Sequence, residues 1–254
     1  MENSVETAVS ILGKMKTCVA LTGAGISVES GVPDYRSSKG IWERFPPEEY
    51  ASLEAFKSNP SKVWGCWREL ALSFCGKEPN KGHRVLAELE ALGYIEAVIT
   101  QNIDGLHQQA GSRNVIEFDG NTRSASCLEC GRTSPLEVDN LPDAPLRCQR
   151  CDGLMRPDVL FFGETIDKEV WRNTLKYLRT CDVMIIIGTS GKVSPAADLP
   201  MLAKDQGAVI LEFNVYPTVF TDSITDKFIQ GSASKTLTLL ETLIRKKELP
   251  LAGN

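Results

Sequence analysis

The sequence predicts an α/β protein in which helices connect the strands of a parallel sheet and a smaller lobe is attached. Short apolar runs alternate with amphipathic stretches, which is the pattern of parallel strands joined by helices. Each apolar run ends in a polar or glycine-containing segment, as expected where such strands end at a ligand site. Two regions, 38–82 and 123–157, interrupt the alternation, and we expect them to be insertions that form the smaller lobe.

Length and composition limit the classes of protein to consider. The 254 residues suffice for one large domain or one domain with a small insert, and 42% hydrophobic with 24% charged residues is ordinary for globular proteins. The net charge of −5 creates no field that would draw the chain to DNA or an anionic membrane. Residues 1–6 do not resemble a secretory signal, and the longest apolar run, 183–187, is far shorter than a membrane span. We therefore expect a cytoplasmic protein without direct contacts to nucleic acid or membrane.

The elements of the sheet domain are expected in a definite order. Residues 5–15 and 82–93 have apolar side chains at helical spacing, and a closing helix is expected near 234–246. Four apolar runs are predicted to be buried strands: Cys18–Thr22, Ala97–Thr100, Val183–Ile187 and Ala208–Phe213. The segments that follow them are Gly23–Gly25, Gln101–Asp104, Gly188–Ser190 and Asn214. Because ligands of open parallel sheets bind beyond the carboxyl ends of the strands, these four segments should line one crevice.

The second interruption carries two closely spaced cysteine pairs. Cys127 and Cys130 are separated from Cys148 and Cys151 by 17 residues, whereas the other four cysteines lie among apolar neighbours. Four thiolates in this pattern close a tetrahedron around Zn2+ and leave no open position for water, so we expect a structural site. Four unrelated buried thiols are a weaker alternative at this spacing. A nucleic-acid-binding ribbon is also weaker, because the module has five arginines and five acidic residues.

The first predicted strand leads into a glycine-containing loop, Gly23-Ala-Gly25, that would let main-chain amides approach a pyrophosphate. The loop departs from the usual G-x-G-x-x-G, because the third glycine comes late, at Gly31, and no strand-end acidic residue follows at the usual distance to hold a ribose. A tight turn is therefore the alternative for these glycines taken alone. The continuation, Val32-Pro-Asp-Tyr-Arg36, favours a nucleotide site.

Several motifs together carry a family resemblance. They are Gly23–Ser27 with Ser30–Arg36, Gln101–His107, the two cysteine pairs, Arg156–Pro157 with Phe162–Glu164, Gly188–Ser190 with Pro195–Ala197, and Asn214 with Pro217–Thr218. With these motifs in this order over nearly its whole length, the chain resembles the sirtuins, which are NAD-dependent protein-lysine deacylases. The resemblance implies a Rossmann-like NAD-binding domain of residues 1–37, 83–122 and 158–254. It also implies a small lobe made of a helical module, residues 38–82, and a zinc-binding module, residues 123–157.

The resemblance further implies roles for residues in a cleft between the two lobes. Those implied near the pyrophosphate and nicotinamide of NAD are Gly23, Ala24, Gly25, Ser27, Asp34, Tyr35, Arg36, Gln101, Asn102 and Asp104. Those implied at the adenosine half are Gly188, Thr189, Ser190, Asn214, Ser232 and Ala233. Asn102 and Asp104 are also implied in catalysis, since an amide and a carboxylate match the donors and acceptor of the nicotinamide carboxamide. Turn capping is the alternative for Asp34 and Asp104.

The second implied ligand is the acyl-lysine side chain of a protein or peptide, entering from the opposite side of the cleft. One wall of its groove would be Val159, Phe161, Phe162, Gly163 and Glu164, and the other Gly191, Lys192 and Val193. One of the two phenylalanines is expected in the core instead. Family members that take acidic acyl groups have a Tyr-x-x-Arg pair in the helical module. The corresponding stretch, 63–69, contains Arg68 but lacks that pair in register, so we expect acetyl or longer neutral acyl groups.

One position departs from the family pattern. Asp119 stands between Phe118 and Gly120, where sirtuins have the histidine that acts as general base, and neither His83 nor His107 matches that position. Reference pKa values of about 3.9 for aspartate and about 6.5 for histidine make Asp119 the weaker base, so we expect strongly impaired deacylation. The alternatives are a binding protein for NAD and acyl-lysine without turnover, an ADP-ribosyltransferase, or a substitution introduced to stop turnover. We expect the chain to be a monomer.

Overall fold

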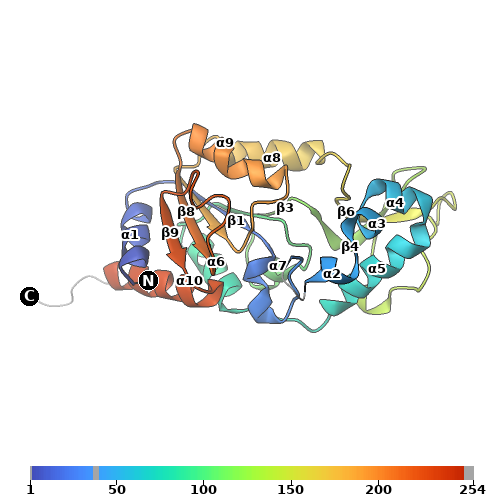
Figure 1. Cartoon of the computed structure of the whole chain (residues 1–254), viewed down its shortest axis with the longest axis horizontal. Helices are drawn as coiled ribbons and strands as arrows, with labels where there is room; N and C mark the ends of the chain where they lie inside the picture. The colour runs from blue at the N-terminus through green and yellow to red at the C-terminus, as the bar shows by residue number, and fades with distance from the viewer. Residues whose placement is uncertain (1, 37–39, 249–254) are drawn as a thin grey trace, which may run out of the picture.

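The computed structural model describes residues 2–36 and 40–248 in two lobes of unequal size (Figure 1). The predicted boundary between residues 37 and 38, like residue 1 and residues 249–254, lies outside the described residues. The larger lobe is built on a six-stranded sheet in the order β3-β2-β1-β7-β8-β9, and all neighbouring strands pair in parallel. The strands are β1 Cys18–Thr22, β2 Ala97–Thr100, β3 Val115–Glu117, β7 Val183–Ile187, β8 Val209–Asn214 and β9 Lys227–Gln230. The expected parallel, Rossmann-like sheet is therefore confirmed.

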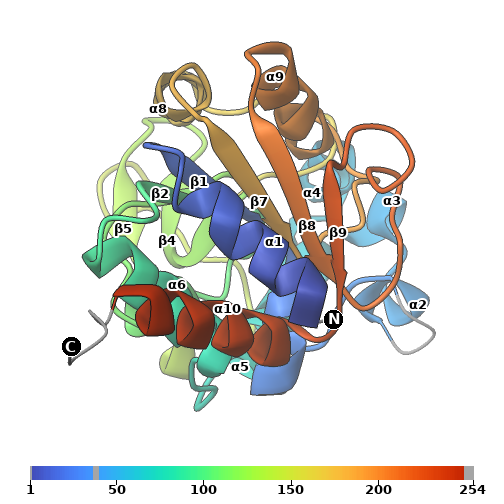
Figure 2. The same ribbon diagram turned by 90° about the vertical axis from the view of Figure 1, so that its left-hand side faces the viewer.

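Helices cover both faces of this sheet (Figure 2). On one face lie α1 Glu2–Leu12, α6 Lys81–Ala91 and α10 Ala233–Glu248, and on the other lie α8 Lys168–Leu178 and α9 Leu199–Asp205. Successive residues of β7 face opposite sides: Ile185 packs with the first group of helices and Ile186 with the second. Burial on both faces explains why the central strands are continuous apolar runs rather than alternating ones.

The helix α6 is fixed to the loop that follows β1. Asn80 caps the helix, because its side-chain oxygen accepts a hydrogen bond from the Gly82 amide at 2.8 Å. The side-chain nitrogen of Asn80 donates to the main-chain oxygen of Ile26 at 2.7 Å. Ile26 ends the 3-10 helix Ala24–Ile26, which is followed by a second one, Val28–Ser30. One side chain thus fixes the start of a helix and the glycine-containing loop to each other.

The smaller lobe combines helices with a second sheet. Its helices are α2 Ile41–Arg44, α3 Pro47–Tyr50, α4 Leu53–Ser58 and α5 Pro60–Ser73, and its antiparallel sheet contains β4 Gly120–Cys127, β5 Thr133–Pro135 and β6 Met155–Val159. The buried Trp64 and Trp67 of α5 pack against Leu141 and join the two parts of the lobe. Strands β4 and β6 begin or end outside 123–157, so the sheet extends across the predicted limits of the zinc-binding module.

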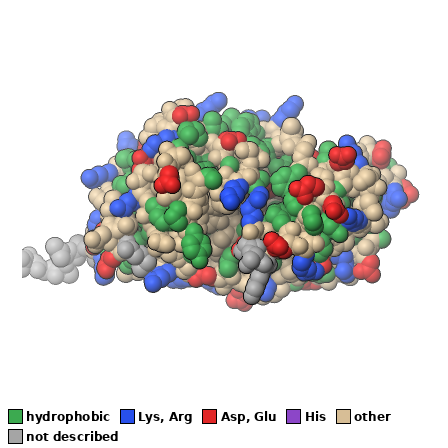
Figure 3. All heavy atoms as spheres, in the orientation of Figure 1, with side chains coloured by type: hydrophobic (Ala, Val, Ile, Leu, Met, Phe, Trp, Pro, Cys, Tyr) green, Lys and Arg blue, Asp and Glu red, His purple; other side chains and the backbone are tan. Residues whose placement is uncertain are grey.

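The described surface has no extended region of one charge on the face shown in Figure 3, where lysine and arginine side chains are interspersed with acidic ones. This agrees with the small net charge of −5. Among the helices of the described residues, none has both the length and the apolar character that crossing a membrane requires.

Candidate active site

A cavity of about 880 Å³ opens where the carboxyl ends of the sheet strands meet the smaller lobe. Residues from all four predicted strand-end segments line it: Gly23–Gly25, Gln101 and Asn102, Gly188–Ser190, and Asn214. The predicted crevice is therefore confirmed. Its volume lies within the range of about 300–1,000 Å³ that is usual for sites that bury a ligand.

The glycines of the two central strand-end segments are required by the close approach of their main chains. The Gly25 amide donates to the Gly188 oxygen at 2.8 Å, and a Cβ on Gly25 would lie 2.7 Å from the Cα of Gly188. Gly188 has a φ of +61°, and a Cβ there would lie 2.5 Å from the Ile26 nitrogen. Any side chain at either position would separate the two loops. The motif Gly23-Ala-Gly25 and Gly188 thus pack against each other and form one surface of the cavity, here called the glycine floor.

Ser27 and Asp104, two of the predicted cofactor residues, lie beneath the cavity rather than in its lining. The buried Ser27 hydroxyl donates to Asp104 Oδ2 at 2.7 Å and accepts a hydrogen bond from the side-chain nitrogen Nδ2 of Asn102 at 3.1 Å. The other oxygen of Asp104 accepts the Leu106 amide at 2.9 Å, at the start of α7 Leu106–Gln109, so the turn-capping alternative describes part of its role. Burial raises the pKa of Asp104, although these hydrogen bonds oppose the rise.

The two histidines form a buried pair below this floor. Their rings are 4.9 Å apart, His83 Nε2 lies 3.3 Å from the Ser27 hydroxyl, and His107 Nε2 lies 2.9 Å from the Thr22 hydroxyl. Burial lowers the pKa of His83 to about 4 and lowers that of His107 well below its usual value, so both rings are neutral at pH 7. Neither histidine lines the cavity.

Asp119 does line the cavity, two residues beyond the end of β3. Its main-chain oxygen accepts the Leu160 amide at 2.8 Å, which sets it beside the predicted substrate wall. Among residues 2–36 and 40–248, no hydrogen bond or ion pair engages its carboxylate. Burial raises the pKa of Asp119 to about 7. The carboxyl group is thus poised to exchange a proton near neutral pH.

The segment from Asp34 to Arg36 lines the cavity beside Asp119. The Arg36 amide donates to Asp34 Oδ1 at 3.1 Å, and the Tyr35 ring packs 5.1 Å from the ring of Trp42 in the smaller lobe. Burial, followed by the negative charges of Asp104 and Asp119, raises the pKa of the Tyr35 hydroxyl. Tyr35 therefore keeps its proton at neutral pH.

The predicted substrate wall connects the two lobes through main-chain hydrogen bonds. The Phe162 amide donates to the main-chain oxygen of Ala51 at 2.9 Å, and the Leu53 amide donates to the main-chain oxygen of Phe162 at 3.0 Å. Phe161 is 3% exposed and stacks on Phe56, whereas Phe162 is 41% exposed, so one phenylalanine is in the core as expected. Val159, Gly163 and Glu164 also line the cavity. The Glu164 carboxylate forms an ion pair with Arg156 and accepts a hydrogen bond from the Phe161 amide at 2.9 Å. These contacts stabilise the turn that contains Phe161 and Glu164.

At the other end of the cavity, the predicted adenosine residues have partners within the protein. Gln101 donates to the Thr189 hydroxyl at 2.9 Å, and the Asn214 amide donates to the Thr189 main-chain oxygen at 3.0 Å. The Ser232 hydroxyl donates to Glu29 at 3.1 Å. Ser190, Ser232 and Ala233 line the cavity. Of the predicted second wall of the acyl-lysine groove, Lys192 and Val193 line the cavity, whereas Gly191 does not.

Several lining residues were not predicted from the sequence. From the smaller lobe they are Ile41, Trp42, Tyr50, Ala51, Cys66, Trp67 and Leu70, and from the larger lobe they include Glu29 and the segment 215–219. The only sequence signal for the first group was the concentration of tryptophans in residues 38–82, which did not separate cavity from core.

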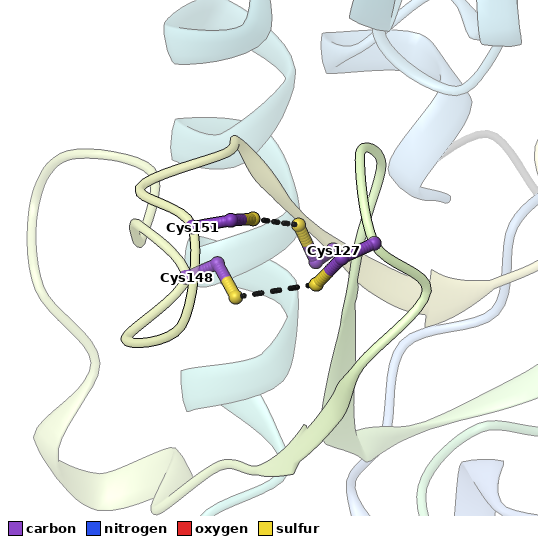
Figure 4. Close-up of side chains that lie close together, drawn as sticks. Cys127, Cys148 and Cys151 are labelled. Carbon is purple, nitrogen blue, oxygen red and sulfur yellow. Dashed lines mark hydrogen bonds between the residues drawn. The ribbon is translucent and has the colours of Figure 1, made fainter.

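The four paired cysteines converge in the smaller lobe, outside the cavity lining. Their sulfur atoms all lie within 4.8 Å of one another, with 3.5 Å between Cys127 and Cys151 and 3.7 Å between Cys130 and Cys148 (Figure 4). Tetrahedral Zn2+ with Zn–S bonds of about 2.3 Å places its sulfurs about 3.8 Å apart. The Arg150 amide lies 3.4 Å from the Cys148 sulfur and helps to lower its pKa, which favours the thiolate that binds metal. The predicted cluster is confirmed, and its geometry fits Zn2+.

Comparison with known proteins gives a consistent family match. The model of the Sir2 family matches residues 23–195. An NAD-dependent protein deacylase 2 of Pyrobaculum aerophilum is 44% identical over 237 residues, which cover 93% of this chain and 94% of the relative. A solved Sir2 homolog–NAD complex superimposes with a TM-score of 0.90 at 38% identity and covers 95% of this chain and 94% of its own. A Sir2 variant with a deacetylated peptide and O-acetyl-ADP-ribose has a TM-score of 0.87 at 32% identity, over 94% and 98% of the two chains.

Proposed function

The chain belongs to the Sir2 family, and on that basis we propose that it is an NAD-dependent deacylase that removes acyl groups from lysine side chains of proteins. The observation that supports this most directly is the cavity, in which the glycine floor and Asp119 open into one space. The Sir2 homologues solved with NAD and with a deacetylated peptide support NAD and an acyl-lysine peptide as its two ligands. The cytoplasmic location and the monomeric state stay predictions.

The residues present fit NAD at the floor of the cavity. The main chain at Ala24 lines the cavity where a pyrophosphate would bind, and Arg36, which also lines it, offers the pyrophosphate a positive charge. We assign Asn102 and Asp34 to the nicotinamide side. Ser27 and Asp104 would act from below by fixing the Asn102 amide. Gly188, Thr189, Ser190, Asn214, Ser232 and Ala233 would surround the adenosine half. Bound NAD supplies the ribose carbon that accepts the acyl oxygen.

Asp119 is the proposed general base. It stands where the family has a histidine, and it lines the cavity beside the substrate wall. With its pKa raised to about 7, Asp119 is as basic as an ordinary histidine. A difference in basicity therefore gives no reason to expect slower catalysis by the aspartate. The aspartate side chain is shorter than an imidazole, and proton transfer requires heavy atoms within about 2.6–3.2 Å. We therefore propose that deacylation is slow because the Asp119 carboxylate lies too far from the ribose hydroxyl to accept its proton efficiently.

The decisive experiment compares the protein with Asp119→His and Asp119→Asn variants on an acetyl-peptide with NAD. We expect the histidine variant to raise the rate of O-acyl-ADP-ribose formation by about 100- to 1,000-fold, within the range of general base catalysis. The asparagine variant should lose deacylation while it still binds both ligands. An unchanged rate in Asp119→His would show that position 119 is not the base position.

A binding protein without turnover is the second candidate, because Asp119 replaces the family's base. In that case neither nicotinamide nor O-acyl-ADP-ribose would form, although NAD and acetyl-peptide would bind. ADP-ribosyl transfer would instead release nicotinamide and leave ADP-ribose attached to protein. Measuring both small-molecule products in the same reaction separates the three activities.

The lining of the smaller lobe supports neutral acyl groups. Its residues, Ile41, Trp42, Tyr50, Ala51, Cys66, Trp67 and Leu70, are all uncharged. Arg68 does not reach the cavity, because its guanidinium donates to the Leu141 oxygen at 2.9 Å and lies 3.2 Å from Asp143. Within the part of this lobe that the structure describes, no cation is available in the cavity to pair with a succinyl or malonyl group.

A further inference from the structure

The Asp119 carboxylate differs from every other acidic group near the substrate wall in having no partner among the described residues. Glu164 is neutralised by Arg156, Asp104 accepts hydrogen bonds from Ser27 and Leu106, and Asp158 accepts one from Ser124 at 2.5 Å. Within residues 2–36 and 40–248, the only hydrogen bond of Asp119 is the one that its main-chain oxygen accepts from the Leu160 amide. A largely desolvated carboxylate that lines an open cavity is a site for a cation or a hydrogen-bond donor.

The surroundings of Asp119 suit the side chain of lysine. The cavity beside it is lined by Val159, Leu160 and the half-exposed Phe162, which offer apolar surface to a four-carbon stem. An ammonium group at the end of that stem has three donors for a carboxylate that lacks any. A histidine at the same position would be neutral or positively charged and could not make this ion pair.

We propose that Asp119 makes the groove a binding site for unmodified lysine, held as an ammonium–carboxylate pair, so that the deacylated product competes with the acyl-lysine substrate. The inference rests on the proposed function, because it uses the same groove. It adds a second class of ligand, a peptide whose lysine carries its positive charge, and it makes product retention a property of this chain.

Protonation of Asp119 gives the proposal a distinctive pH dependence. Below about pH 7 the carboxyl group is protonated in the free protein, so binding of an ammonium group must release that proton. The Kd for unmodified lysine should therefore fall about tenfold for each pH unit between pH 5 and pH 7, and then become constant. A neutral acyl-lysine gains nothing from the ionised form, so its Kd should not fall.

Other titrating groups near Asp119 do not produce the same profile. The hydroxyl of Tyr35, which faces Asp119, has a raised pKa and stays protonated throughout this range. Glu164 and Asp158 are engaged by Arg156 and Ser124, and Asp104 lies below the cavity floor. Asp34 and Arg36 also line the cavity beside Asp119, and Lys192 lines it as part of the opposite predicted wall.

The test is calorimetric titration, without NAD, of two peptides that differ only in acetylation of one lysine. We expect Asp119→Asn to weaken the unmodified peptide at least tenfold at pH 7.5 and to abolish its pH dependence, with less than about a threefold change for the acetylated peptide. Asp205→Asn, which removes an exposed carboxylate on the larger lobe, is the control with the same change in net charge and should leave both affinities unchanged. Repeating the titration at pH 6 in buffers of different ionisation enthalpy should reveal the released proton.

The outcomes distinguish the inference from the function on which it rests. If the acetylated peptide binds but the unmodified peptide binds equally well to the protein and to Asp119→Asn, the ammonium site is disproved and the deacylase proposal stands. If neither peptide binds to the protein at any pH, the peptide groove itself is wrongly assigned, and both proposals are overturned.

Discussion

The carboxyl group of Asp119 is held in a site that favours its protonated form, and this has a cost for the folded protein. Burial raises its pKa to about 7, whereas in the unfolded chain an aspartate has a pKa of about 3.9. Below about pH 3 the group is protonated in both states and makes no difference. As the pH rises to about 7 the unfolded chain ionises first, so the folded state loses up to about 4 kcal/mol relative to it.

Asp119→Asn removes this penalty, because an amide cannot ionise. We expect the variant to exceed the protein in free energy of unfolding by up to about 4 kcal/mol at pH 8, and by almost nothing at pH 3. Urea unfolding followed by circular dichroism at a series of pH values measures the difference. A difference that stays constant from pH 4 to pH 8 would contradict the assigned burial of the carboxylate.

The second sheet connects the cysteine cluster to the proposed substrate groove. Strand β4 carries Cys127 at its end, β6 pairs with β4, and the proposed substrate wall continues directly from Val159 at the end of β6. Zn2+ bound by four thiolates organises a module that has little apolar core of its own. Loss of the metal should therefore disturb the peptide groove before it disturbs the strand ends of the larger lobe.

Removal of Zn2+ by a chelator should weaken acetyl-peptide binding at least tenfold while NAD affinity changes less than about threefold. The variant Cys127→Ser should reproduce the effect. Cys75→Ser, which changes a cysteine outside the cluster, should behave like the unaltered protein. Equal losses of NAD and peptide affinity on chelation would show that the cluster supports the whole chain rather than the smaller lobe.

The elements that could be predicted from the sequence are those whose burial leaves an unambiguous pattern. Strands β1, β2 and β7 are buried along their full length, and their apolar runs identified them. Strands β3 and β9 at the two edges were missed, because they are short and mostly half-buried. The antiparallel strand β4 was missed because its sequence, rich in serine, threonine and glycine, has no apolar alternation.

The candidate site was predictable to a similar extent. Its strand-end segments were found because parallel topology brings the carboxyl ends of strands together. Helical periodicity could not tell that Cys66 and Trp67 line the cavity, while Trp64, on the same helix, is fully buried. Nor could the sequence place Ser27 and Asp104 below the floor, because this depends on hydrogen bonds between segments about 77 residues apart.

At the scale of the whole molecule, the two lobes divide the proposed specificity between them. The larger lobe supplies the glycine floor proposed to hold NAD, and the smaller lobe supplies the uncharged lining proposed to face the acyl group. Because these surfaces come from separate parts of the chain, a change to one should leave the other unaffected.

The variant Cys66→Arg tests this division by adding a cation to the smaller-lobe lining. We expect kcat/KM for a succinylated peptide to rise at least tenfold relative to that for an acetylated peptide, while the KM for NAD stays within about twofold. Cys75→Arg, on the same lobe but outside the cavity lining, is the matched control. If Cys66→Arg altered only the KM for NAD, the acyl end would have to lie elsewhere in the cavity.

The main-chain bonds between Phe162 and residues 51–53 have a consequence for how this protein can change over time. Main-chain atoms that every residue except proline provides hold the wall in place, and the side chain at position 162 adds an edge contact with the ring of Trp42. If the groove binds peptides as proposed, substitutions at position 162 should alter which peptides bind while the main-chain bonds between the lobes remain. Because main-chain hydrogen bonds hold the wall, single mutations at position 162 could change peptide specificity during evolution without disrupting the fold.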